Sequence, residues 1–345
     1  MIRLTATALA AAVALGAGGA AAQDRGEIYY LIPTLLDEFQ STSQEAIEQV
    51  YGEMGYEVTS LDANNEAARQ LNQCEDAVQT DPVAIILNAV DFDAAGPCIE
   101  AAHGADIPVL VYDRVIKSAG TELTSMAGTI QMGYIAAENI VRLLEERYGE
   151  PRGKVLQIMG DPGDAYTLDI RQGFDERIAE YENIEVDTRA AQRWEASNAG
   201  DIASDRLVAD PDIDLIFVHA AHLAVPVVSV LEAEGNEPGD VMLVSSNGAP
   251  VGLDLIRQGW EQVEVEQPLY AQIWGMAMFT PMIVAGETPE EGTYDILGLD
   301  SELVMEDWGP TLYIPGAAIT SDNVDEPRFW GNLQPPEDPV DPIEP

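Results

Sequence analysis

Basic residues are scarce in this chain. Its 345 residues include 16 Lys and Arg against 61 Asp and Glu, a formal net charge of −45, and lysine occurs only at Lys117 and Lys154. Nucleic acids and anionic lipid surfaces are bound through basic footprints, so we exclude both classes of partner. We interpret the acidity as a solvated surface suited to salty surroundings, where screening reduces self-repulsion. Calcium binding is the alternative, but the acidic residues are dispersed and do not follow EF-hand spacing.

Long hydrophobic runs are absent after residue 22. A membrane-spanning helix needs about 20 consecutive apolar residues, and no later segment approaches that length. The first 22 residues have the pattern of a signal peptide, with Arg3 as the charged region, 4–15 as the apolar region and 20–22 as the cleavage site. A membrane anchor is the alternative, but the run is too short and too rich in alanine. We therefore expect an exported, periplasmic protein without membrane insertion.

Cysteine occurs only twice, at Cys74 and Cys98. Both are expected on helices that flank a strand at 83–87, and such helices can lie side by side on one face of a doubly wound sheet. Export to an oxidising compartment permits a disulfide between them. We favour this bridge over the alternative of two buried free thiols.

Catalytic motifs are also missing. There is no Gly-x-Ser-x-Gly elbow, and the glycine-containing segment 149–155 has the wrong spacing for a phosphate loop. His219 and His222 lie three residues apart without a clear third metal ligand. Reading Asp37 and Glu266 as the two carboxylates of a glycosidase would require a defined separation, which a sequence does not supply. We therefore expect no enzyme, no metal and no cofactor.

Strands and helices alternate along the chain, which is typical of a parallel α/β sheet. Strands are expected at 27–32, 57–61, 83–87, 107–112, 123–126, 154–159, 184–188, 213–219, 241–245 and 263–267. Helices are expected at 37–54, 66–79, 93–103, 133–148, 167–181, 196–209, 224–234, 251–258 and 269–284. The pattern restarts after residue 126, so the sequence predicts an α/β protein of two similar Rossmann-like lobes with parallel sheets.

Polar residues follow two of these strands where the strands end. Asn88 follows the strand at 83–87, and Asp113 and Arg114 follow the strand at 107–112. In an open parallel sheet, ligands bind outside the carboxyl ends of the strands. A carboxylate next to a guanidinium suits a hydroxyl-rich ligand, because both groups form charge-assisted hydrogen bonds.

Several short segments of the chain follow one another in a specific order and spacing. They are 61–65, 70–73, 90–94, 107–109, 113–114, 160–164, 173–174, 210–214 and 267–268. In this order they resemble the ribose-type (class I) periplasmic sugar-binding proteins, the solute receptors of bacterial ABC importers. The resemblance covers about residues 24–331, and it is specific for the family rather than for a sugar.

The resemblance implies the periplasmic binding protein-like I fold, in which a three-segment hinge joins the lobes. We expect the three crossings near 127–131, 266–269 and 308–313. The expected N-terminal lobe comprises 24–126 and 269–308, and the expected C-terminal lobe comprises 128–266 and 313–331. The tail at 334–345 holds five prolines among acidic residues, and we expect it to be disordered.

The resemblance also implies a ligand site between the lobes. Its expected ligand-binding residues are Asp37, Phe39, Asn88, Asp113, Arg114, Trp194, His219, Asn247 and Glu266. Phe39 and Trp194 match aromatic residues of the family that pack against the sugar. The alternatives are a core residue for Phe39, a hydrophobic plug for Trp194 and a salt bridge across the hinge for Asp113 with Arg114.

The second lobe departs from the family pattern. Ile170 stands where the family commonly has Arg, and the pair Ala220-Ala221, next to His219, replaces Asn-Asp. Asn247 replaces an Asp, and Glu266 replaces a Gln. These changes remove hydrogen-bonding groups, which fits a less hydroxylated or differently shaped ligand.

The resemblance implies a monomeric solute-binding protein that captures a small polar ligand, a monosaccharide or related polyol, and closes around it by hinge motion. The closed form would deliver the ligand to an ABC permease. One alternative is a receptor that presents its ligand to a chemotaxis or sensor-kinase partner. An exported glycoside-processing enzyme is the third hypothesis.

Overall fold

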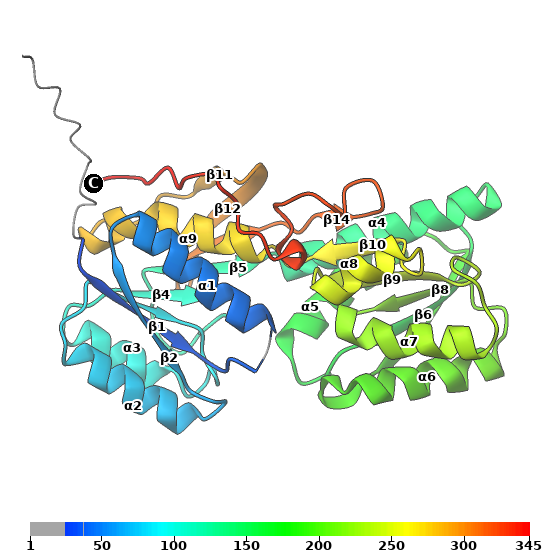
Figure 1. The fold of residues 1–345 in the computed structure, drawn as a ribbon, viewed down its shortest axis with the longest axis horizontal. Helices are drawn as coiled ribbons and strands as arrows, with labels where there is room; N and C mark the ends of the chain where they lie inside the picture. The colour runs from blue at the N-terminus through cyan, green and yellow to red at the C-terminus, as the bar shows by residue number, and fades with distance from the viewer. Residues whose placement is uncertain (1–24, 37) are drawn as a thin grey trace, which may run out of the picture.

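The protein folds into two α/β lobes that lie side by side (Figure 1). The structure is a computed structural model, in which we describe residues 25–36 and 38–345. The predicted signal peptide at 1–22 and the predicted site residue Asp37 lie outside the described residues. Each lobe is built on one mostly parallel sheet with helices on both faces, which confirms the predicted fold class.

The first lobe contains an eight-stranded sheet of order β11-β12-β13-β5-β4-β3-β1-β2, in which β12, near one edge, pairs antiparallel with both β11 and β13. Its strands are β1 (Glu27–Ile32), β2 (Glu57–Asp62), β3 (Ala84–Leu87), β4 (Val109–Tyr112), β5 (Leu123–Ala127), β11 (Gly292–Ile296), β12 (Leu299–Glu306) and β13 (Gly309–Ile314). Its helices are α1 (Glu38–Glu53), α2 (Ala67–Val78), α3 (Gly96–His103) and α9 (Leu269–Val284).

Strand β1 illustrates why the middle of this sheet is buried on both faces. Side chains alternate between the two faces of a strand. Ile28, Tyr30 and Ile32 join the apolar cluster that contains α1 and α9, whereas Leu31 joins the cluster that contains α2 and α3. Figure 1 shows these two helix pairs on opposite sides of the sheet. The continuous apolar strands therefore follow from parallel pairing under two helix layers.

The second lobe contains a six-stranded sheet of order β14-β10-β9-β8-β6-β7, with β14 antiparallel at its edge. Its strands are β6 (Gly153–Met159), β7 (Ile184–Ala190), β8 (Leu215–Val218), β9 (Met242–Asn247), β10 (Val263–Glu266) and β14 (Ala318–Ile319). Its helices are α4 (Thr129–Tyr148), α5 (Ala165–Ile178), α6 (Ala196–Ala209), α7 (Ala221–Ala233) and α8 (Pro250–Arg257).

Helices α4 and α5 pack unusually closely, and two glycines allow it. A Cβ atom on Gly133 would lie 2.2 Å from the carbonyl oxygen of Ile170, and one on Gly173 would lie 2.0 Å from that of Ile130. Real Cβ atoms do not approach so near, because interiors are already close-packed. Gly173, part of a segment that resembles the sugar-binding family, is therefore required for packing of the second lobe.

The chain passes between the two sheets at three places. β5 leads into α4 at 127–129, and β10 leads into α9 at 266–269, as the sequence predicts. The third crossing lies at 314–318, between β13 and β14, and not at the predicted 308–313. The prediction is wrong there because Gly309 and Pro310 suggest a loop, whereas they begin a strand that pairs with β5. The exact lobe boundaries remain a prediction.

The C-terminal tail lies against the first lobe, which differs from its predicted disorder. The indole Nε1 of Trp274 donates to the carbonyl oxygen of Asp338 at 2.8 Å, and the amide of Ile343 donates to that of Met278 at 2.8 Å. Arg25 and Glu344 form an ion pair at 2.6 Å. Val340 and Ile343 also pack against the apolar cluster around α9. The composition of the tail does not reveal this packing, because only two apolar side chains hold the extended segment against the lobe.

Removal of residues 334–345 should lower the free energy of unfolding by about 2 kcal/mol, since Val340 and Ile343 lose partly buried contacts. Urea denaturation of the truncated and full chains measures the difference. The matched control is Glu344→Gln, which breaks only an exposed ion pair and should cost less than about 1 kcal/mol. An unchanged unfolding midpoint after truncation would show that the tail does not stabilise the fold.

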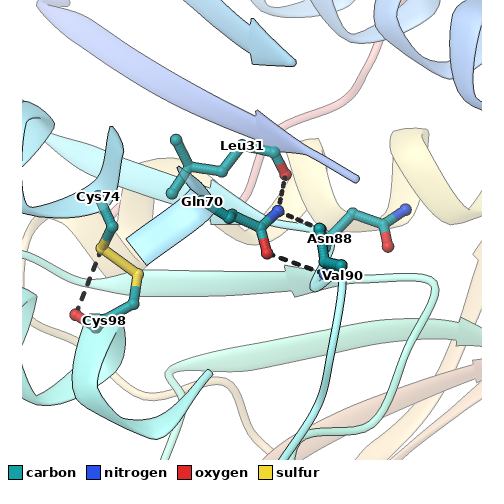
Figure 2. The surroundings of a disulfide bond; sticks show 6 residues. All are labelled: Leu31, Gln70, Cys74, Asn88, Val90 and Cys98. Carbon is teal, nitrogen blue, oxygen red and sulfur yellow. Dashed lines mark hydrogen bonds between the residues drawn. A yellow bond between two sulfur atoms is a disulfide. The ribbon is translucent and has the colours of Figure 1, made fainter. Parts of the chain in front are cut away.

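A disulfide joins Cys74 on α2 to Cys98 on α3 (Figure 2). One turn before Cys74, the buried Gln70 side chain donates to the carbonyl oxygen of Asn88 at 2.8 Å and accepts from the amide of Val90 at 2.8 Å. Figure 2 shows the hydrogen bonds of Gln70 to the main chain of Asn88 and Val90, whereas the Asn88 side chain points away from Gln70. The disulfide-linked helix thus positions the loop that follows β3.

Replacing both cysteines by alanine should lower the free energy of unfolding by about 3 kcal/mol, because the bridge spans 24 residues of sequence. Denaturant titration of the oxidised protein and the double variant measures this difference. Reduced wild-type protein serves as the second reference and should match the variant. Equal stability of all three forms would contradict a stabilising bridge.

Among the described residues, none of the helices combines the length and the apolar character needed to span a bilayer.

Candidate ligand site

Polar side chains from both lobes meet where the chain passes between the sheets. Asn88 follows β3, Asp113 follows β4, Asn247 ends β9, and Gln267 follows β10. The amide nitrogen of Gln267 donates to Asp113 Oδ1 at 2.6 Å, and Gln267 Oε1 accepts from the Asn247 amide at 3.0 Å. This line of hydrogen bonds joins the first lobe to the second through the second crossing. We call these four residues, together with Tyr30, Tyr166 and Gln272, the interlobe cluster.

Asp113 is the central acceptor of the interlobe cluster. Its backbone adopts a left-handed conformation with φ of 66°, which Asp tolerates better than most residues. Besides Gln267, the Gln272 amide on α9 donates to Asp113 Oδ1 at 3.4 Å. The neighbouring Arg114 is exposed, and its Nη1 donates to the carbonyl oxygen of Ala89 at 3.2 Å. Arg114 therefore ties the loop after β4 to the loop after β3.

Four side-chain atoms in the cluster are buried without completing a hydrogen bond to a described residue. They are Tyr30 Oη, Asn88 Oδ1, Tyr166 Oη and Gln272 Oε1. Tyr30 lies near Asn88, and Tyr166 lies near Ser246, but neither approach makes a bond of good geometry. A buried polar atom left unpaired costs about 1–3 kcal/mol. Four such atoms in one place therefore require an explanation.

The same tyrosines lie within electrostatic reach of Asp113. Burial first, and then the Asp113 carboxylate, raises the pKa of Tyr30. Burial also raises the pKa of Tyr166; the nearby Ser246 hydroxyl opposes this shift, and the charge of Asp113 adds to it. Because Tyr30 lies on β1 and Tyr166 on α5, the charge of Asp113 acts on tyrosine hydroxyls from both lobes.

Aromatic rings pack beside the cluster. The rings of Phe39 and Tyr112 stack with centroids 6.4 Å apart and planes 12° apart, and Trp330 meets Phe39 edge-on at 5.5 Å. The Trp330 indole donates to the carbonyl oxygen of Asn247 at 2.8 Å. Phe39 is only 6% exposed, so the structure places it in the aromatic core between the lobes. Its predicted stacking on a sugar does not follow from this position.

Trp194 lies behind Tyr166 rather than in the cluster itself. Its ring centroid is 6.0 Å from that of Tyr166, and its indole donates to Asp164 Oδ2 at 3.2 Å. The indole also covers Gly160, where a Cβ atom would lie 2.1 Å from the ring. The nearby His222 Nε2 lies 3.1 Å from the carbonyl oxygen of Trp194. Trp194 therefore supports Tyr166 from the second lobe.

His219 is a core residue of the second lobe. It is fully buried, with Nε2 3.1 Å from the Gln157 amide nitrogen and Nδ1 2.7 Å from the Thr167 hydroxyl. Burial lowers the pKa of His219 to about 3, so the ring is neutral. Because both ring nitrogens already have partners, the structure does not bring His219 into the cluster.

Glu266 is likewise set apart from the cluster. Its side chain is 3% exposed, and a Cβ atom on Gly248 would lie 3.3 Å from its Cγ. Burial raises the pKa of Glu266 to about 8, against the opposing effects of Arg328 and the Trp330 main chain. The neighbouring Gln267, which is not among the predicted site residues, hydrogen-bonds to Asp113 and Asn247 instead.

Of the predicted site residues, Asn88, Asp113 and Asn247 lie in the interlobe cluster, and Arg114 lies next to Asp113. Tyr30, Tyr166, Gln267 and Gln272 also lie in the cluster but are not predicted from the sequence. Gln267 could have been found from the sequence, because it is a polar residue directly before Pro268, the N-cap residue of α9. Tyr30 and Tyr166 give no such signal, because a tyrosine in a strand or at a helix start is commonly a packing residue.

Two further observations bear on what the site holds. Within 25–36 and 38–345, no three His, Cys, Asp or Glu side chains are grouped to hold a metal ion. A cavity of about 1010 Å³ lies elsewhere, between the tail and β11, and is lined by Trp274, Met278, 295–298, 326–328 and 333–341. Its lining includes none of the unpartnered buried atoms, so the interlobe cluster is the stronger candidate for a polar ligand.

Comparison with known proteins places this geometry in context. Residues 28–288 match the family described as "Periplasmic binding protein domain". The ribose import binding protein RbsB of Salmonella typhimurium is 25% identical over 252 residues, which cover 73% of this chain and 82% of that protein. The D-apiose import binding protein of Actinobacillus succinogenes is 24% identical over 249 residues, covering 72% and 78%.

Solved structures share the fold. A periplasmic ribose ABC transporter protein from Conexibacter woesei has a TM-score of 0.75 at 17% identity and covers 89% of this chain and 96% of that chain. An ABC transporter solute-binding protein from Bacillus halodurans, with bound myo-inositol, has a TM-score of 0.69 at 22% identity and covers 87% and 96%.

Proposed function

Because the chain belongs to the periplasmic binding protein domain family, we propose that it captures a monosaccharide or related polyol for a bacterial ABC importer. The ligand binds between the lobes, and the closed protein delivers it to a permease. The observation that carries this proposal is the set of four buried, unpartnered atoms around Asp113. Hydroxyl groups of a ligand would supply the missing partners.

The chemistry of the cluster favours an uncharged, hydroxylated ligand. Asp113, Asn88 Oδ1 and Gln272 Oε1 can only accept hydrogen bonds, whereas the hydroxyls of Tyr30 and Tyr166 can donate or accept. A sugar or polyol hydroxyl also does both, so it can serve every one of these groups. The names of relatives agree with this class, since they include proteins for ribose, D-apiose and xylitol.

Capture requires the lobes to move about the three crossings. The ligand can drive closure only through contacts that it makes better in the closed form than in the open form. In this proposal, Asp113 from the first lobe and the buried Tyr166 hydroxyl from the second make such contacts at the same time. We propose binding rather than catalysis as the role of the site, in a monomeric protein of the periplasm.

A thermal-shift and calorimetry screen tests the proposal. The probes are D-ribose, D-apiose, D-arabinose, xylitol, D-allose and myo-inositol, with D-glucuronate as a charged control. At one hundred times its dissociation constant, a ligand should add about 2.7 kcal/mol of stability. We expect at least one neutral probe to bind and the charged control not to bind. A screen in which no neutral probe binds would overturn the proposal.

A further inference from the structure

Tyr166 stands apart from the other residues of the interlobe cluster. It comes from the start of α5 in the second lobe, and its hydroxyl is buried although the residue as a whole is only partly buried. The hydroxyl has no completed hydrogen bond among the described residues. A phenylalanine would keep the packing of this ring without the hydroxyl. The buried hydroxyl of a tyrosine therefore costs stability unless something binds it.

The ring of Tyr166 contacts a tryptophan ring that is itself held in place. Trp194 packs against it, and Trp194 is fixed in turn by Asp164 and by the close approach of Gly160. Asp164 also caps α5, because its side chain accepts from the amide of Tyr166 at 3.0 Å. A side chain fixed on both its backbone and its ring side is preorganised, which lowers the entropy cost of binding through it.

The second lobe has few other free groups to offer at this place. The Ser246 hydroxyl donates to the carbonyl oxygen of His219 at 2.8 Å, and the Asn247 amide donates to Gln267. His219 is occupied on both nitrogens, and Glu266 is buried away from the cluster. Tyr166 is therefore the second-lobe side chain in the cluster with a buried polar atom that lacks a completed hydrogen bond among the described residues.

We propose that Tyr166 determines specificity from the second lobe: its hydroxyl binds one ligand hydroxyl, and its ring covers a less polar side of the same ligand. This inference rests on the proposed function of the site. The ligand class that fits is a neutral monosaccharide or polyol whose hydroxyls gather on the side of Asp113. Loss of a hydroxyl on the Tyr166 side is tolerated better than loss of one on the Asp113 side, where a charged acceptor would be left unpaired.

Tyr166→Phe tests the inference by removing only the hydroxyl. The probe is whichever of the six neutral sugars and polyols of the screen binds the wild-type protein most tightly, together with its monodeoxy analogues. We expect Tyr166→Phe to weaken binding of the parent probe about tenfold. For the one analogue that lacks the hydroxyl read by Tyr166, the variant and the wild type should bind alike.

Two controls separate recognition from a structural role. Without ligand, the thermal midpoint of Tyr166→Phe should equal or exceed that of the wild type, because an unpaired buried hydroxyl is gone. Tyr134→Phe removes a hydroxyl that bonds Glu176 on the exposed surface of the same lobe, and it should leave affinity unchanged.

The outcomes are distinct. If the wild type binds none of the six neutral probes of the screen, the proposed function fails and this inference fails with it. If the wild type binds a probe and Tyr166→Phe binds it equally well, the inference alone is overturned. A lower midpoint of the ligand-free variant, with equal weakening for every analogue, would assign Tyr166 a structural role and also overturn it.

Discussion

Asp113→Asn should weaken binding of the sugar or polyol about 100-fold. Hydrogen bonds to a charged acceptor contribute about 1.5–3 kcal/mol each, and the carboxylate lies at the centre of the interlobe cluster. Asparagine keeps the size of the side chain and accepts the left-handed backbone at this position, so the fold should persist. Isothermal titration calorimetry with the best neutral probe of the screen measures the loss.

Asp106→Asn is the matched control. Asp106 lies in the same lobe, has a left-handed backbone with φ of 59°, and is exposed outside the cluster. It should bind the probe as the wild type does. If both variants lose affinity alike, the effect comes from net charge or backbone strain; if neither does, Asp113 does not hold the ligand.

Stability should fall steeply as the pH rises from about 5 to about 9. Burial raises the pKa of Glu264 to about 7 and that of Glu266 to about 8, from an ordinary value of 4.5. Burial, and next the neighbouring Glu264, also raises the pKa of Glu261. These carboxyls bind protons more tightly in the folded state than in the unfolded state. Their stabilising contribution is therefore complete below about pH 4.5 and is lost as the pH passes the folded values.

The expected size of this effect is large. Each unit of difference in pKa corresponds to about 1.4 kcal/mol, so Glu266 alone can account for up to about 4 kcal/mol between pH 5 and pH 9. Urea denaturation across this range measures the slope. The experiment is run in high salt, because screening suppresses the surface repulsion that the net charge of −45 would add in the same direction.

Glu264→Gln and Glu266→Gln provide the test of cause. Each glutamine keeps the shape of the neutral acid, so each variant should lose part of the slope and gain stability relative to the wild type at pH 9. Glu264 accepts from the Ser245 hydroxyl at 2.6 Å and from the Gly248 amide. A glutamine oxygen can accept from Gly248 while its NH2 group donates to the Ser245 hydroxyl oxygen. A wild-type free energy of unfolding that stays constant or increases with pH would contradict the account.

Much of the fold could be predicted from the sequence, and particular strands show why. β3 and β4 are short apolar runs that each follow a helix, which is the pattern of a strand buried on both faces. β12 and β13 are missed, because the exposed side of β12 is polar and β13 begins with Gly309-Pro310. Alternation between strand and helix also stops there, so no periodic pattern marks the third crossing.

The candidate site also contains residues that the sequence predicts and residues that it does not. Asn88 and Asp113 are found because polar residues directly after buried strands must lie at one edge of the sheet. His219 has the same sequence context, yet it is buried against Gln157 and Thr167, which depends on packing that no local pattern shows. Tyr30 and Tyr166 are missed for a related reason, since only the structure reveals that their hydroxyls lack partners. Assignment of all these residues to ligand binding remains a prediction.

A crystal structure of the protein with its best-binding neutral probe tests the central claim most directly. The account predicts the probe between the lobes, with its oxygen atoms within about 3.2 Å of Asp113, Asn88 and Tyr166. A probe bound instead in the cavity beneath the tail, lined by Trp274 and Leu297, would contradict it. So would a probe between the lobes that leaves the four buried atoms unpaired.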